Sequence, residues 1–153
     1  FGRIEVRCKL EGVQGSWPAI WMLPQSIKWP KGGEIDILER LNYDAFVYQT
    51  VHSPYTQKGN TEYPKHSTTA PIRPTDYNVY AVEWDEKEIK WLSNGRVYKR
   101  LSMKKVAKSS ENTFKLPHFL MINVALQNKT GEDGDVKFPT EMKVDYVRVY
   151  KKK

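Results

Sequence analysis

Three acidic residues are concentrated in one short run of the chain, Gly32-Gly33-Glu34-Ile35-Asp36-Ile37-Leu38-Glu39-Arg40. Two carboxyl groups held about 5–5.5 Å apart can cleave a glycosidic bond with retention, one as the nucleophile and the other as the acid. Like charges on one face also repel one another, which tends to raise at least one pKa and so keeps a proton available. These residue types make Glu34, Asp36 and Glu39 candidate catalytic residues.

The spacing of the three acids requires a correction to regular strand geometry. Glu34 and Asp36 lie two residues apart and share one face of an extended strand, whereas strict alternation would turn Glu39 toward the core. One extra residue, inserted as a β-bulge at Ile37 or Leu38, would restore the phase and bring all three acids to the same face. A solvated acidic strand face and a site for a hard cation are the alternatives at this point.

Two tryptophans precede the acids, in the segment Gly15-Ser16-Trp17-Pro18-Ala19-Ile20-Trp21-Met22-Leu23-Pro24. Trp17 and Trp21 are four residues apart, so an extended backbone places them on the same side. Their rings could form the walls of a groove for sugar rings, which neither alternative for the acids explains.

The elements around this motif are predicted to be short strands. From Phe1 to Leu10, apolar and charged residues alternate with a period of two, with Cys8 among the core residues and both Glu5 and Arg7 on the polar face. Ser93-Asn94-Gly95 suits the positive φ values of a tight hairpin turn. The other strands are predicted over Glu34–Arg40, Phe46–His52, Val79–Trp84, Glu88–Leu92, Arg96–Leu101, His118–Leu126 and Met142–Tyr150.

The remaining segments support an all-β fold, a sandwich or barrel in a single domain over residues 1–153. Met103–Ser110 could form a short turn of helix, and Ser53–Asp76 is predicted to be a long loop at the rim of a site. Trp84 and Trp91 follow the apolar spacing of their strands, which predicts packing in the core or against the hairpin.

Composition narrows the classes of protein only a little. With 39% hydrophobic and 28% charged residues, the chain is neither disordered nor collagen-like. The formal charge of +7 would permit an acidic partner, but much of the excess comes from short lysine runs that are typical of solvated edges. The single cysteine excludes an internal disulfide, and the sequence has neither a zinc-ligand cluster nor an apolar run long enough to span a membrane.

Three motifs together resemble glycoside hydrolase family 16, the laminarinase-like β-glucanases. They are Phe1-Gly-Arg-Ile-Glu-Val-Arg7, Trp17-Pro-Ala-Ile-Trp21 and Glu34-Ile-Asp-Ile-Leu-Glu39. Weaker similarities, at Tyr80–Trp84, Ile89–Trp91, Ile122–Ala125 and Val144–Tyr150, extend the resemblance over nearly the whole chain. The resemblance implies a curved, concanavalin A-like jelly-roll sandwich with an open cleft.

The resemblance also implies roles for individual residues. Glu34 would be the nucleophile, Glu39 the acid/base, and Asp36 the residue that tunes the pair. Asp145 matches a position that holds calcium in some relatives. Substrate-binding positions would be Glu5, Arg7, Trp17, Trp21, His52, Asn123 and Gln127, although a surface ion pair for Glu5 and Arg7 and a surface histidine at position 52 are the structural alternatives.

The chain departs from the family pattern in two places. Leu126-Gln127-Asn128-Lys129-Thr130-Gly131 stands where many relatives have Gly-Gly-Asn-Trp, which removes an expected cleft aromatic and leaves the preferred glycan open. Relatives also carry strands before the position of Phe1, so the chain is expected to lack N-terminal strands and to have unpaired sheet edges.

The resulting hypothesis is a retaining endo-hydrolase of β-1,3- or β-1,3-1,4-glucan that needs no organic cofactor, binds no nucleic acid, has no membrane span and acts as a monomer outside the cell, secreted or at the cell surface. An endo-β-galactosidase of the same family and a catalytically silent sugar-binding module are the alternatives. A nucleic-acid binder would need basic residues among the groove aromatics, where this sequence has three acids.

Overall fold

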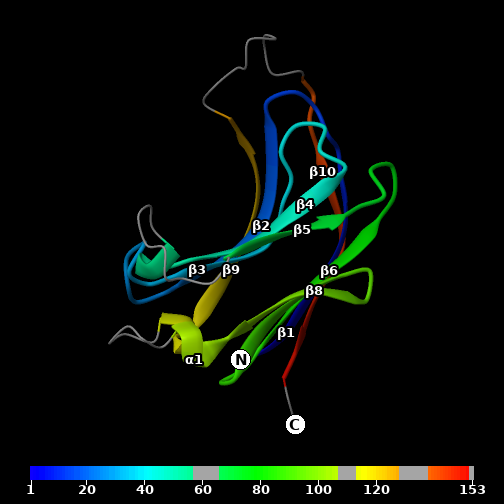
Figure 1. The fold of residues 1–153 in the computed structure, drawn as a ribbon. Helices are drawn as coiled ribbons and strands as arrows, with labels where there is room; N and C mark the ends of the chain where they lie inside the picture. The colour runs from blue at the N-terminus through cyan, green and yellow to red at the C-terminus, as the bar shows by residue number, and fades with distance from the viewer. Residues whose placement is uncertain (57–65, 107–112, 128–137, 152–153) are drawn as a thin grey trace.

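The computed structural model describes residues 1–56, 66–106, 113–127 and 138–151. Two antiparallel five-stranded sheets face each other across one core (Figure 1). The first sheet has the order β10-β1-β6-β7-β8, and the second, which carries the acidic motif, has the order β5-β4-β3-β2-β9. The prediction of an all-β sandwich is confirmed.

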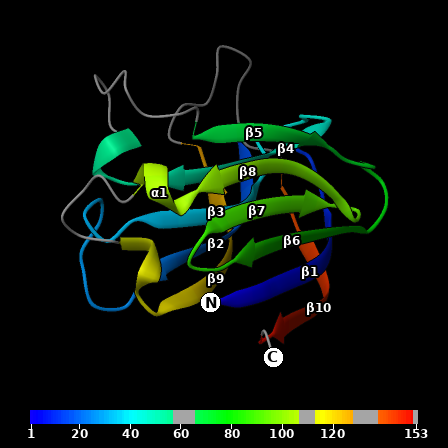
Figure 2. The ribbon, with the colours of Figure 1, turned by 60° about the horizontal axis from the view of Figure 1, so that its bottom comes forward.

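Most strands place apolar side chains between the sheets and polar side chains outside, whereas β9 and β10 leave apolar side chains such as Phe119, Ile122 and Val149 exposed. The first sheet contains β1 (Gly2–Leu10), β6 (Asn78–Trp84), β7 (Glu88–Ser93), β8 (Arg96–Ser102) and β10 (Met142–Tyr150). The second contains β2 (Ser16–Pro24), β3 (Glu34–Glu39), β4 (Phe46–His52), β5 (Ser67–Pro71) and β9 (His118–Leu126). Figure 2 shows the first sheet from outside, with both chain ends near β1 and β10.

The core follows the predicted pattern. Cys8 and Trp91 are fully buried and Trp84 is nearly so, which confirms the predicted core packing of all three. In the hairpin between β7 and β8, Asn94 and Gly95 have φ values of 47° and 81°, as a turn with two left-handed residues requires.

The segment that was predicted to be a loop, Ser53–Asp76, contains regular structure in its described part. A short 3-10 helix, η1 (Pro54–Thr56), is followed by strand β5, which pairs with β4. The prediction was wrong for β5 because Ser67-Thr-Thr-Ala-Pro71 has no apolar alternation, and its strand conformation depends on its neighbour.

The predicted helix at Met103–Ser110 is present as α1 (Met103–Val106), and the rest of the prediction lies outside the described residues. A second 3-10 helix, η2 (Thr113–Lys115), precedes β9. None of the helices in the described ranges has the length and hydrophobicity that crossing a lipid bilayer requires.

Candidate active site

The strand that carries the three acids contains a β-bulge. Against β2, Asp36 and Leu38 pair with consecutive residues, so Ile37 is the extra residue, and the register against β4 shifts between Asp36 and Glu39. Ile37 and Leu38 both belong to the hydrophobic core between the sheets, whereas strict alternation would turn one of two neighbouring residues to the other face. The predicted bulge is confirmed, and its effect is to turn Glu39 back toward the face of Asp36.

The three carboxyl groups form one cluster on the face of the second sheet that points away from the core. Glu34 and Asp36 share a hydrogen bond, the charge of Glu39 acts on Asp36, and the charge of Glu34 acts on Glu39. The neighbouring strands complete the cluster: His52 Nε2, from β4, lies 3.3 Å from Asp36 Oδ2, and Trp17 Nε1, from β2, donates to Glu39 Oε1 at 2.9 Å. His52 thus lies beside the acids, and its role in binding substrate stays a prediction.

Burial gives these carboxyl groups an unusual affinity for protons. Desolvation, followed by the charge of Asp36, raises the pKa of Glu34 to about 7. Asp36 is only 1% exposed, and desolvation followed by the charge of Glu39 raises its pKa well above the ordinary value. Desolvation also raises the pKa of Glu39, against the hydrogen bond from Trp17, which favours the ionised form. The cluster therefore retains protons at a pH where free carboxyl groups have lost them.

Aromatic side chains surround the cluster. Trp17 and Trp21 lie on the same face of β2, as predicted, and Trp21 Nε1 donates to Asn123 Oδ1 of β9 at 2.7 Å. Sequence reasoning missed Trp29, whose side chain donates a hydrogen bond to Glu34 although its ring remains 54% exposed. The feature of the sequence that could have identified Trp29 is its position five residues before Glu34.

A pocket of about 220 Å³ opens beside Glu39. The pocket extends from the central strands of the second sheet toward β5. A ligand in this pocket would contact the Glu39 carboxyl group directly. The side chains that line it are mainly polar or aromatic, namely Trp17, Glu39, Leu41, Tyr48, Thr50, His52, His66 and Ser67.

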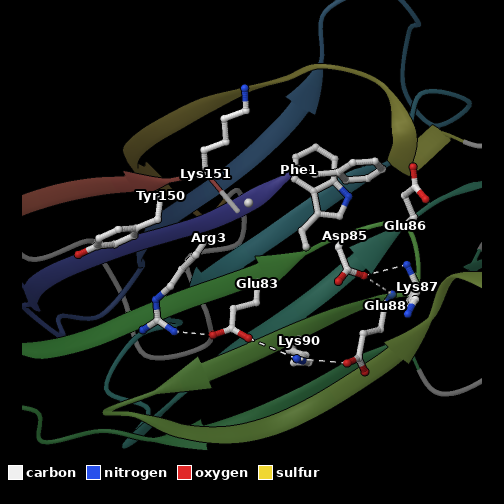
Figure 3. Close-up of a pocket in the computed structure, with 12 residues that line it drawn as sticks. Phe1, Arg3, Glu83, Asp85, Glu86, Lys87, Glu88, Lys90, Tyr150 and Lys151 are labelled. Atoms are coloured by element: carbon white, nitrogen blue, oxygen red, sulfur yellow. Dashed lines mark hydrogen bonds and ion pairs between the residues drawn. The ribbon is translucent and has the colours of Figure 1, made fainter. Parts of the chain in front are cut away.

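A larger cavity, of about 590 Å³, lies elsewhere, between the start of β1 and the turn from β6 to β7 (Figure 3). Its charged side chains neutralise one another: Arg3 binds Glu83, and Lys90 lies between Glu83 and Glu88. We place the chemistry at the smaller pocket because it is lined by Glu39, one of the three clustered carboxyl groups with raised pKa values.

The prediction that Glu5 and Arg7 line the cleft is wrong. Their strand, β1, belongs to the other sheet, and its polar face is the outer surface of the sandwich. Glu5 accepts hydrogen bonds from Arg3 and Tyr146, and Arg7 forms an ion pair with Asp145. These are the surface ion pairs that were the structural alternative.

The described residues do not fit a calcium ion at Asp145. Its carboxylate is paired with the Arg7 guanidinium, and among the described residues it belongs to no group of three or more His, Cys, Asp or Glu side chains that could hold a metal ion. Within that part, the one group that could hold a metal ion is Glu34, Asp36 and His52, whose ligand atoms lie within 4.8 Å of one another.

Gln127 lies directly after β9, where its backbone N–H donates to Gly15 O at 2.9 Å. This places it near the end of β2 that begins with Ser16 and Trp17, and its binding role stays a prediction. The neighbouring departure from the family pattern, at Asn128–Gly131, lies outside the described residues.

Comparison with known proteins places this geometry in a family. The model of "Glycosyl hydrolases family 16" matches residues 1–148. A beta-glucanase from Rhodothermus marinus is 35% identical over 99% of this chain, and a keratan-sulfate endo-1,4-beta-galactosidase from Sphingobacterium multivorum is 34% identical over 99%.

Solved structures agree with the sequence relatives. The catalytic domain of an endo-1,3-beta-glucanase (laminarinase) from Thermotoga petrophila superimposes with a TM-score of 0.86, at 37% identity over the whole of this chain. The chain spans 64% of that structure, 57% of the Rhodothermus relative and 37% of the Sphingobacterium relative. It therefore matches part of each longer protein.

Proposed function

The chain belongs to glycosyl hydrolases family 16, and from this membership we propose that it cleaves β-1,3- or β-1,3-1,4-glucan internally, with retention of anomeric configuration. Relatives named as glucanases support a glucan substrate, among them the beta-glucanase of Rhodothermus marinus and a glucan endo-1,3-beta-glucosidase of Niallia circulans. The single observation that carries the proposal is the bulge in β3, because it brings Glu39 to the same face as Glu34.

In the proposed reaction, Glu34 attacks the anomeric carbon while Glu39 gives its proton to the departing glycosidic oxygen. The bond to that oxygen breaks as the ester bond to Glu34 forms. Glu39, now ionised, then takes a proton from a water molecule that attacks the same carbon and releases Glu34. Each of the two steps inverts the configuration of the anomeric carbon, so the product has the same configuration as the substrate.

This cycle requires Glu34 to be ionised while Glu39 keeps its proton. Glu34 is the more exposed member of its hydrogen-bonded pair with Asp36, which is 1% exposed. A charge is more costly at the more buried site, so we infer that Asp36 keeps its proton to a higher pH than Glu34, whose pKa is about 7. Once Glu34 has lost its proton, the carboxyl group of Asp36 can donate a hydrogen bond to it. Desolvation, which raises the pKa of Glu39, supports its role as the proton donor.

The surrounding side chains suit a polysaccharide. Exposed indole rings offer faces on which sugar rings can stack, and Trp17 and Trp29 are 37% and 54% exposed. Trp21 is fixed through its N–H by Asn123, so its ring is already oriented before a ligand binds. We propose that these aromatic side chains, with His52, bind the glucan on either side of the cleaved bond, outside the cell.

An endo-β-galactosidase is the second candidate, since the Sphingobacterium relative carries that name at 34% identity. Product analysis separates the candidates: purified protein is incubated with laminarin, mixed-linkage glucan, agarose and poly-N-acetyllactosamine, and the oligosaccharides released are separated and sized. We expect oligosaccharides from the two glucans. Products from agarose or poly-N-acetyllactosamine alone would instead identify a galactosidase, and binding without cleavage of any polymer would indicate a sugar-binding module.

A further inference from the structure

The bulge that positions Glu39 is contacted from the core by two buried side chains. Trp91, on β7 of the opposite sheet, donates its indole N–H to the backbone carbonyl of Asp36 at 2.8 Å. Gln49, on β4, donates its side-chain N–H to the carbonyl of Ile37 at 3.1 Å. Both side chains are 0% exposed. We call Trp91 and Gln49 the bulge clamp.

These two hydrogen bonds meet a need that the bulge creates. A bulge disrupts the ladder between strands, and a buried carbonyl without a partner costs about 1–3 kcal/mol. The clamp residues bind the two consecutive carbonyl groups at the point where the register shifts. A regular strand at this place would turn these carbonyl groups differently and lose both partners, so the contacts favour the bulged form.

The clamp also ties the acidic strand to the opposite sheet. The same amide group of Gln49 lies 3.3 Å from the carbonyl of Leu92 on β7, the residue after Trp91. The position of the bulge is therefore fixed relative to both sheets. Ordinary core packing does not require this arrangement, since an apolar side chain of similar volume would fill either site.

We propose that Trp91 and Gln49 are positioning residues for the carboxyl cluster: by holding the carbonyl groups of Asp36 and Ile37, they keep Glu39 on the catalytic face. The role in catalysis rests on the proposed function. The positioning itself does not, because it concerns where Glu39 lies in the free protein.

A matched control separates positioning from a general loss of core packing. Trp84 is also buried and donates its indole N–H to a backbone carbonyl, that of Phe114, at 2.7 Å. Trp84→Phe and Trp91→Phe thus remove the same atoms and the same kind of hydrogen bond. Of these two tryptophans, Trp91 alone is bonded to the acidic strand.

The first readout is steady-state kinetics of the two variants on laminarin. A displacement of about 1 Å at a reacting group can lower the rate by about 100-fold. For Trp91→Phe we expect kcat to fall between about 10- and 100-fold with KM within about threefold, because the substrate groove remains. Trp84→Phe should keep kcat within about threefold of the wild type.

The second readout needs no activity. The indole N–H of Trp17 donates to Glu39 Oε1, so its resonance in a ¹⁵N–¹H NMR spectrum reports the position of that carboxylate. The chain has five tryptophans, and each indole signal can be assigned by substitution. We expect the Trp17 signal to move in Trp91→Phe and to stay in place in Trp84→Phe.

Gln49→Met provides an independent test, because it removes the amide donor and keeps a side chain of similar size. It should move the Trp17 signal and lower kcat in the same direction, and it decides the question if Trp91→Phe does not fold. Clamp variants with the wild-type Trp17 signal and wild-type kcat would overturn the inference. A wild-type protein that cleaves none of the glycans would refute the proposed function, while the NMR comparison would still decide the positioning.

Discussion

Replacing Glu34 with glutamine should stabilise the protein at neutral pH while removing its proposed nucleophile. The side chain keeps its shape and loses its charge. In the folded protein, desolvation and the charge of Asp36 raise the pKa of Glu34 from its ordinary value of 4.5 to about 7. The fold thus favours the protonated form. The contribution of Glu34 to the stability of the folded protein is complete below about pH 4.5 and is lost as the pH rises through about 7.

The size of the effect follows from this difference in pKa. Taken in full, the change from 4.5 to about 7 corresponds to about 3 kcal/mol of lost stability above pH 7. Glu34 remains partly exposed, and solvent screening reduces the figure to about 1–2 kcal/mol. Glutamine has no charge to desolvate, so Glu34→Gln should recover this amount at pH 8 and close to nothing at pH 4.

Urea unfolding followed by tryptophan fluorescence at pH 4, 6 and 8 measures the difference directly. Glu83→Gln is the matched control on the other sheet. Burial alone would raise the pKa of Glu83, but hydrogen bonds from Arg3 and Lys90 lower it overall, so this variant should lose stability at pH 8. The reasoning fails if Glu34→Gln is destabilised at pH 8, or if its gain is the same at all three pH values.

Further predictions concern the chemistry. In Glu34→Ala, azide should restore turnover and yield the α-glycosyl azide, whereas in Glu39→Ala it should yield the β-product on substrates with good leaving groups; identical anomers, read by NMR, would refute the assigned roles. Asp36→Asn should lower kcat without changing the anomer formed. Trp17→Phe removes a hydrogen bond that lowers the pKa of Glu39, so the alkaline limb of the pH–rate profile should move upward, and an unmoved limb would contradict the contact. Arg7→Ala, on the outer face, should leave kcat and KM within about twofold, and a large increase in KM would return this residue to the substrate site.

Local patterns in the sequence were sufficient to predict much of the second sheet. Consecutive apolar residues at Ile37 and Leu38, between acids on one face, leave few ways to bury both other than a bulge. The Asn94-Gly95 turn follows from the same kind of local argument, because few residues adopt positive φ at low cost. Strand β5 could not be predicted, because only its pairing with β4 makes it a strand.

The sequence by itself determined which residues share a face of a strand, and so it brought Glu34, Asp36 and Glu39 together. It could not determine which side of the molecule a polar face would occupy. Alternation in β1 separates Glu5 and Arg7 from the core, but only the assignment of β1 to the other sheet places them away from the acids. The bulge clamp was equally inaccessible, because its donors lie 12 and 55 residues from the carbonyl groups they bind. A period of two is a local property of the chain, whereas these contacts exist only once two distant strands pack across a core.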